Sequence, residues 1–264
     1  MAKTTNNTKQ KKESNQVGSG ELYRIAKEKF YKVYDFDPGT KKSDMKWIRV
    51  GKIDNVNRPI KWNFFDGKRL LSDRDFDKAD VFCKGRAVVT LDKKSNVLKD
   101  DGTTVFGKWY DSVLELASGD GYIVEEKQDE CGLKRVSAFA DYDGNIVSEW
   151  FRSILPMLHG NLYTVARSTG KGVLDKVEAV YDFSKRETIS DWYDSISMYI
   201  GTPKCSHVKH GGKYNLLDTS GNPVFPVWSA RPVSPDKNGK CQLFELDGKA
   251  YNADASTGEL EEIK

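Results

Sequence analysis

Residues 211–228 read GGKYNLLDTSGNPVFPVW and contain the pattern that decides the fold. A short apolar run, YNLL (214–217), leads into a polar turn at Ser220-Gly221, and Trp228 follows the turn. Glycine adopts positive φ values at little cost, so an Asp-Gly or Ser-Gly step favours a tight hairpin turn. The stretch therefore predicts short strands joined by a hairpin.

The same polar-plus-glycine turn recurs along most of the 264-residue chain. Its positions are Asp66-Gly67, Asp101-Gly102, Asp143-Gly144, Ser220-Gly221 and Thr257-Gly258, with Ser184-Lys185 as a degenerate copy. Successive turns are 35, 42, 41, 36 and 37 residues apart. A period of this length indicates a repeat architecture.

Two further landmarks accompany each turn. An aromatic position follows it, occupied by Trp109, Trp150, Trp192 and Trp228, with Phe76 expected to take the place in the first copy. A residue repeated in every unit usually has one structural role, so we expect this column to fill the core between units. A second glycine then marks another turn, at Gly85, Gly119, Gly160, Gly201 and Gly239.

Each unit is expected to hold three or four short antiparallel strands, because β-branched and aromatic runs flank the turns. We predict an all-β fold of tandem repeats of about 35–42 residues, forming one domain over residues 21–264. Two architectures agree with this repeat, a propeller-like ring and an open β-solenoid. In the ring, a strand from residues 30–50 would complete the short last copy, residues 251–264. Leu22, Ile25 and Ala26 share one face of a short N-terminal helix.

The repeat resembles the WG-repeat family over about residues 46–258. The stretches IKWNFFDGKRLL (60–71) and GGKYNLLDTSGNPVFPVW (211–228) fit its pattern best. The Trp-Gly dipeptide of the family is replaced by Trp62-Asn63, Tyr214-Asn215 and Tyr251-Asn252. The resemblance implies a β-rich repeat scaffold and little about chemistry.

The net positive charge of the chain comes from its first twenty residues. The chain has 42 Lys and Arg against 39 Asp and Glu, and residues 1–20 hold four lysines against Glu13 alone. We expect this basic tail to be disordered, because it has almost nothing apolar to bury. The remaining residues are balanced, so nothing indicates a nucleic-acid-binding body. No apolar run is long enough for a membrane span or a secretory signal, which predicts a cytoplasmic protein or a component of a phage particle.

Motifs that carry chemistry are weak in this sequence. Cys205, His207 and His210 form a C-x-H-x-x-H pattern, but a structural zinc site needs four ligands, and His159 is the one other histidine. Phosphate-binding loops and nucleophile signatures do not occur. The four cysteines form no CxxC pair, and we expect them to be reduced. We therefore predict no catalytic site, metal or cofactor.

Three function hypotheses follow. The first is a non-enzymatic scaffold that binds a protein partner of unknown identity through loops or edges of the repeat. The second is a structural component of a larger assembly, such as a phage particle or a cell-surface complex. The third is a small-ligand or glycan-binding module, to which Tyr110, Phe151 and Tyr193 contribute if they face outward.

Overall fold

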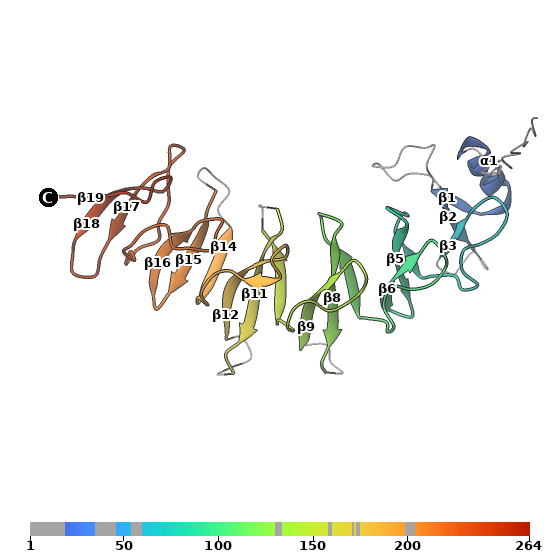
Figure 1. Ribbon diagram of the computed structural model, residues 1–264, viewed down its shortest axis with the longest axis horizontal. Helices are drawn as coiled ribbons and strands as arrows, with labels where there is room; N and C mark the ends of the chain where they lie inside the picture. The colour runs from blue at the N-terminus through green and yellow to red at the C-terminus, as the bar shows by residue number, and fades with distance from the viewer. Residues whose placement is uncertain are drawn as a thin grey trace, which may run out of the picture. The chain divides into compact units, whose positions relative to one another are not determined.

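A computed structural model of the protein describes residues 19–34, 46–53, 60–129, 134–157, 160–170, 172, 175–198 and 204–264. The chain divides into two compact units, one up to Trp109 and one from Tyr110 to Lys264, and each is described by itself (Figure 1). Most of the basic tail predicted for residues 1–20 lies outside the described residues, and Ser19 and Gly20 begin a helix.

The first unit contains the helix and two three-stranded antiparallel sheets, ordered β1-β2-β3 and β4-β5-β6. Its elements are α1 (Ser19–Lys29), β1 (Lys32–Tyr34), β2 (Ile48–Lys52), β3 (Lys61–Phe65), β4 (Lys78–Ala79), β5 (Arg86–Leu91) and β6 (Lys94–Lys99). The described part of the chain has α1 as its helix, and that helix is too short and too polar to cross a membrane.

The second unit contains four more sheets, ordered β7-β8-β9, β10-β11-β12-β13, β14-β15-β16 and β17-β18-β19. Its elements are β7 (Ser112–Glu115), β8 (Gly121–Lys127), β9 (Arg135–Asp141), β10 (Ser153–Pro156), β11 (Leu162–Ser168), β12 (Lys176–Asp182), β13 (Glu187–Thr188), β14 (Ser195–Met198), β15 (Ser206–His210), β16 (Lys213–Leu217), β17 (Lys240–Phe244), β18 (Ala250–Asp254) and β19 (Leu260–Glu262). The predicted all-β fold of short antiparallel strands is thus confirmed, with three or four strands in each sheet.

The recurring turns are hairpin turns whose geometry explains their sequence. Gly144 and Gly221 have φ values of 90° and 83°, in the left-handed region that favours glycine. The carboxylate of Asp218 accepts hydrogen bonds from the backbone N–H groups of Ser220 (2.8 Å) and Asn222 (2.9 Å). In the degenerate copy the left-handed residue is Arg186 (φ 59°), one position after the predicted Lys185.

Asp141 shows how strongly such a turn holds its carboxylate. Burial alone raises the pKa of this group, but hydrogen bonds from the Asn145 backbone and side chain and from the Asp143 N–H outweigh it. The pKa of Asp141 therefore lies below its usual value. The turn is stabilised while this carboxylate is charged, and that stabilisation is lost as the pH falls through the lowered pKa.

Turn glycines also make close contact with the preceding copy. A Cβ atom at Gly102 would lie 2.8 Å from the carbonyl oxygen of Leu71. At Gly221 and Gly258 it would lie 2.6 Å from the Ile189 oxygen and 2.7 Å from the Val224 oxygen. The glycine is therefore required by its φ value and by the stacking of one turn on the next.

We predict that Gly221→Ala destabilises the protein more than Gly248→Ala does. Both glycines have positive φ, which costs an alanine about 1–2 kcal/mol. At Gly248 an added Cβ meets nothing within 4 Å, whereas at Gly221 it must displace the Ile189 main chain. Thermal unfolding of the two variants measures the difference. An equal or larger loss for Gly248→Ala would show that turn stacking is unimportant.

After each interior turn the chain returns beside the strand that it has just left; we call residues 222–229 and their equivalents the return segment. The Val224 N–H donates to the Leu216 carbonyl oxygen (2.8 Å), and Ser229 and Tyr214 exchange two hydrogen bonds. Between these points the return segment leaves the regular ladder. Its backbone groups there need another partner, because unpaired polar groups are costly to bury.

A buried asparagine supplies that partner. The Asn215 amide nitrogen donates to the carbonyl oxygens of Phe225 (2.9 Å) and Val227 (3.1 Å), and its oxygen accepts from the N–H groups of Leu216 and Phe225. Asn96 makes the same four hydrogen bonds three copies earlier, and Asn63 binds the first return segment through Ser72 and Arg74. The asparagine column thus fastens the return segment to its strand.

Two copies achieve the same end with a different residue. Ala138 and Ala179 occupy the asparagine position, and the partner comes from the return segment itself. The Ser148 hydroxyl accepts from the Phe139 N–H (2.9 Å) and donates to the Glu149 carbonyl oxygen (2.7 Å). Ser190 repeats the arrangement with the Val180 N–H and the Asp191 oxygen.

We predict that Asn215→Ala lowers the free energy of unfolding by about 2–4 kcal/mol, because it leaves buried backbone donors and acceptors without a partner. Asn252→Ala is the matched control, since Asn252 is exposed on β18, and a change within about 0.5 kcal/mol is expected. Urea unfolding followed by circular dichroism compares the two. Similar midpoints for both variants would contradict the proposed role of the column.

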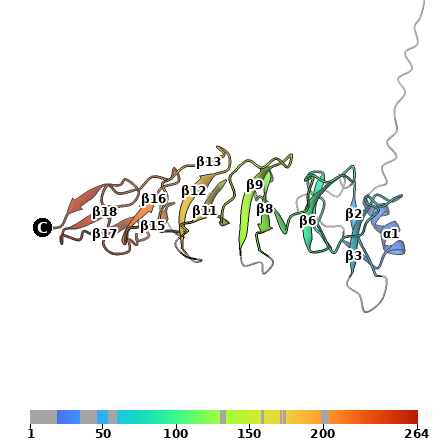
Figure 2. The same cartoon turned by 90° about the horizontal axis from the view of Figure 1, so that it is seen from below.

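The sheets of the second unit follow one another in the order of the sequence (Figure 2). Alternating side chains of consecutive sheets meet in shared hydrophobic clusters. The Phe139 ring of β9 stacks on Tyr181 of β12 at 4.6 Å and meets Tyr163 of β11 edge-on at 4.9 Å. The opposite face of β12 places Val180 against Leu217 of β16. The β10–β13 sheet therefore has two apolar faces, as expected for a stacked repeat.

The first sheet has one face covered by a helix, whereas the last sheet has a polar residue on one face. Leu22 and Ala26 of α1 cover Ile48 and Val50 of β2, so the helix buries the first sheet. On β18 the exposed Asn252 takes the place of Leu216 in the preceding copy, which is fully buried. A polar outer face suits a terminal repeat that no further sheet covers.

The C-terminal sheet is built from three strands that follow one another in the sequence. β18 pairs with β17 on one side and with β19 on the other, through Leu243 and Glu262 opposite Tyr251. β1 pairs with β2. The C-terminal sheet thus obtains its three strands locally. Residues 35–45 lie outside the described residues, so the expectation that a strand from residues 30–50 completes the last copy stays a prediction.

Candidate functional site

The tryptophan column lies at the edge of the core, beside the innermost position of each return segment. Antiparallel bridges join Ser137 to Phe151 and Glu178 to Tyr193, so the buried position is the residue after the indole. Phe151 and Tyr193 are 1 % and 3 % exposed, whereas Trp150 is 36 % exposed. Of the expected core column, Trp109, Trp192 and Trp228 are partly buried and pack against core clusters, and the residue after each indole is the buried one.

The first copy needs the same correction. Phe76 bridges to Trp62 and is buried, which makes it equivalent to Phe151 and not to the indoles. Asp75 takes the indole position and forms an ion pair with Lys52 (3.2 Å). Alternation along an extended segment places neighbouring side chains on opposite sides, so a shift of one residue exchanges core and surface.

The three side chains predicted to bind a ligand if they faced outward are buried. Tyr110, Phe151 and Tyr193 are each less than 5 % exposed. Burial raises the pKa of the Tyr193 hydroxyl, with a further contribution from Asp191. The hypothesis of a small-ligand site depended on these three aromatic side chains facing outward, and they do not.

The residue beside the indole position differs from copy to copy. The Arg167 guanidinium lies over the Trp192 ring at 4.2 Å, and the His210 ring lies 6.0 Å from Trp228. In the first copy Lys52 pairs with Asp75. A constant frame therefore presents a changing pair of side chains at one edge, which is where a repeat protein can vary its recognition.

Trp150 lies in a groove of about 680 Å³ in the second unit. One wall comes from residues of β9 and the end of β8, the other from the end of β11, and the return segment between these sheets supplies Trp150. We call this the Trp150 groove; its polar lining residues are Gln128, Lys134, Arg135, Glu149, Arg152, Arg167 and Ser168.

The cations of the Trp150 groove are held by defined partners. Arg135 forms an ion pair with Glu125 (2.8 Å), and Arg167 pairs with Glu149 while stacking on Trp192. The Arg152 guanidinium donates to the carbonyl oxygen of Asp175 (3.3 Å). These contacts fix the directions of the side chains before any ligand arrives, which lowers the entropic cost of binding.

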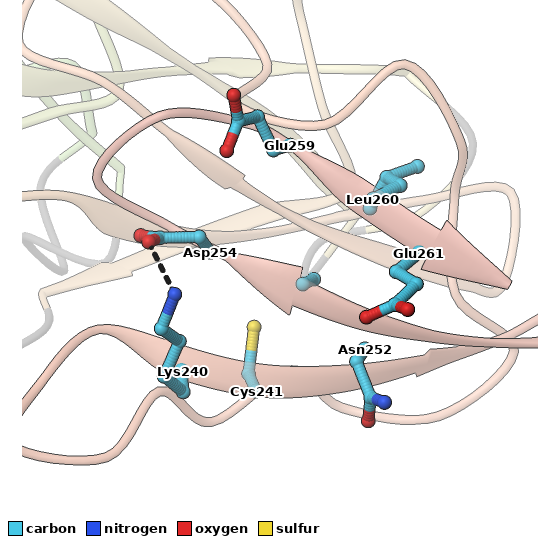
Figure 3. A pocket seen from close by; sticks show the side chains of 8 residues that line it. Lys240, Cys241, Asn252, Asp254, Glu259, Leu260 and Glu261 are labelled. Carbon is cyan, nitrogen blue, oxygen red and sulfur yellow. Dashed lines mark hydrogen bonds and ion pairs between the residues drawn. The ribbon is translucent and has the colours of Figure 1, made fainter. Parts of the chain in front are cut away.

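A second hollow crosses the C-terminal sheet (Figure 3). Lys240 donates a hydrogen bond to Asp254 (2.7 Å) within it, which raises the pKa of Lys240 and lowers that of Asp254. Its other charged side chains are Glu259 and Glu261, and its eight lining residues include no aromatic. The Trp150 groove combines cations with an exposed indole, so it is the better candidate site.

The C-x-H-x-x-H pattern does not form a site. His207 and His210 lie three residues apart on β15 and face opposite sides of the sheet, with His210 beside Trp228. Burial raises the pKa of Cys205 to about 11 and lowers the pKa of His207. Among the described residues no group of three metal-ligating side chains comes together; Cys131 and His159 lie outside them.

No protein-family model and no curated protein matches this chain. Among solved structures it is similar to a eukaryotic initiation factor, at 12 % identity and a TM-score of 0.44 over 76 % of this chain; it spans 56 % of that protein. The WD40 β-propeller domain of Doa1 matches at 11 % identity over 81 % of this chain and 74 % of that one, with a TM-score of 0.30. BamB from Moraxella catarrhalis matches at 10 % identity over 80 % of each chain, with a TM-score of 0.29. Structural similarity at these identities and TM-scores supports no conclusion about function. The resemblance to the WG-repeat family stays a prediction.

We predict opposite consequences for two neighbouring substitutions. Phe151→Ala removes a buried ring and is expected to cost about 3–5 kcal/mol of stability. Trp150→Ala removes a partly exposed indole and is expected to cost about 1 kcal/mol or less. Urea unfolding of both variants tests the assignment. A larger loss of stability for Trp150→Ala would show that Trp150, and not Phe151, fills the core.

Proposed function

We propose that this chain is a non-enzymatic scaffold that binds a protein partner through the Trp150 groove. The observation that carries the proposal is the exposed Trp150 indole beside Arg152 and Arg167 in one concave surface. Tryptophan and arginine are the residues most enriched where binding energy is concentrated in protein interfaces.

The frame around the groove suits a binding role. Stacked aromatic contacts such as that of Phe139 with Tyr181 hold the neighbouring sheets together. Side chains on such a frame are kept in place by packing, which favours precise recognition. The variation beside the indole, from Arg167 to His210, allows each copy to present different chemistry on the same backbone.

The cysteines of the last two sheets support a role without catalysis. Burial raises the pKa of Cys241 to about 11, as it does that of Cys205. Thiols with such pKa values remain protonated near neutral pH, and the thiolate is the nucleophilic form.

The test is affinity capture from the source cell with the intact protein and two variants. The double variant Trp150→Ala, Arg152→Ala alters the groove, and Leu246→Ala removes a side chain that is 76 % exposed in the β17–β18 turn. We expect the wild type and Leu246→Ala to retain the same protein, and the groove variant to lose it. The interaction is then measured with that protein in purified form.

A captured set that is unchanged by the groove variant would refute the proposal for this site. Turnover of a substrate by the purified protein would refute its non-enzymatic character. Circular dichroism of both variants confirms that they fold, so loss of binding cannot be attributed to unfolding.

A further inference from the structure

The side chains that line the Trp150 groove carry an excess of positive charge. Its lining contains Lys134, Arg135, Arg152 and Arg167 against Glu149 alone. Behind the lining, Glu125 pairs with Arg135, Asp129 accepts a hydrogen bond from the Lys134 N–H, and the Asp175 carboxylate lies beside Gly172. The cations therefore predominate among the side chains that face the groove, and most of the neighbouring carboxylates stand outside its lining.

The cations differ in how they are engaged. Arg167 is tied to Glu149 and Trp192, and Arg135 is tied to Glu125. Arg152 donates one long hydrogen bond to a backbone oxygen, and a guanidinium carries five N–H donors. Arg152 and Lys134 therefore provide the main attraction for an incoming anion, and the fork of Arg152 matches a carboxylate.

The Trp150 indole gives the groove an apolar surface that a ligand can cover. The Trp150 ring lies 6.5 Å from the buried Tyr110 ring, so it is supported from behind while 36 % of the residue stays exposed. Removing such a surface from water favours a ligand with an apolar or aromatic group. At Gly170, in the opposite wall, an added Cβ would meet nothing within 4 Å, so a main chain can approach closely there.

We infer that the Trp150 groove binds an extended acidic segment of a partner protein, in which carboxylates flank an apolar or aromatic side chain. The carboxylates pair with Arg152 and Lys134, and the apolar side chain packs on Trp150. This inference rests on the scaffold function proposed above and names the chemistry of its partner.

A peptide fits these features better than a nucleic acid does. A phosphate backbone repeats its charge at every nucleotide and is met by an extended basic surface. Here the cations are confined to the space between two hairpins, and Glu125 and Glu149 lie among them. Alternating attraction and repulsion suits separated carboxylates more than a continuous polyanion.

The test is selection of random twelve-residue peptides displayed on phage against the intact protein and against the double variant Lys134→Gln, Arg152→Gln. We expect the wild type to enrich peptides rich in Asp and Glu around an aromatic or leucine residue. The double variant is expected to lose this enrichment. The control variant Lys237→Gln, which removes an exposed cation outside the groove, is expected to retain it.

The consensus peptide is then synthesised and its affinity measured by fluorescence anisotropy. We expect the double variant and Trp150→Ala each to weaken binding roughly tenfold or more, and Lys237→Gln to change it less than about twofold. Raising sodium chloride from about 50 to about 300 mM is expected to weaken binding several-fold, since the pairs are partly exposed.

A selected pool without acidic enrichment, or no selected pool, overturns the inference. Tighter binding of a twelve-nucleotide thymidine oligomer than of the consensus peptide also overturns it. If the peptide fails while the groove variant still loses its captured protein, the acidic-peptide inference fails and the scaffold function stands. If capture does not depend on the groove, both fail.

Discussion

One buried polar side chain in each interior copy holds the return segment to its strand, and the rest of the repeat depends on it. Asn215 binds four backbone groups that the regular ladder leaves without partners. Ser148 performs part of this task where alanine replaces the asparagine. Without such a group, the return segment would carry unpaired amides into the interior, at a cost of about 1–3 kcal/mol for each buried group.

The surface chemistry follows from this constraint. Once the return segment is fastened, the residue after the indole, such as Phe151, must point inward and close the core. Its neighbour Trp150 must then lie at the surface, between the hairpins of two consecutive sheets. The groove is therefore a consequence of how one copy is joined to the next, and its charge is set by the hairpin residues that vary.

Local chemistry made much of the fold predictable from the sequence. Turn glycines such as Gly144 can be recognised in the sequence because few other residues adopt positive φ values. Their spacing predicts the copies of the repeat. The apolar face of Leu22 and Ala26 predicts the helix, although it does not show that the helix covers a sheet. The alternating strands predict antiparallel sheets, and six are present among the described residues.

The role of Asn215 and the position of Trp150 were decided by tertiary structure. An asparagine in an apolar run is ambiguous in sequence, since its partners lie ten and twelve residues further on and depend on the path of the return segment. The spacing of Asn96 and Asn215 before their turns was the available signal. Similarly, periodicity finds an aromatic pair such as Trp150-Phe151, but not which member is buried, because that depends on a one-residue register. The groove joins Lys134 to Arg167 across 33 residues, and only folding brings such residues together.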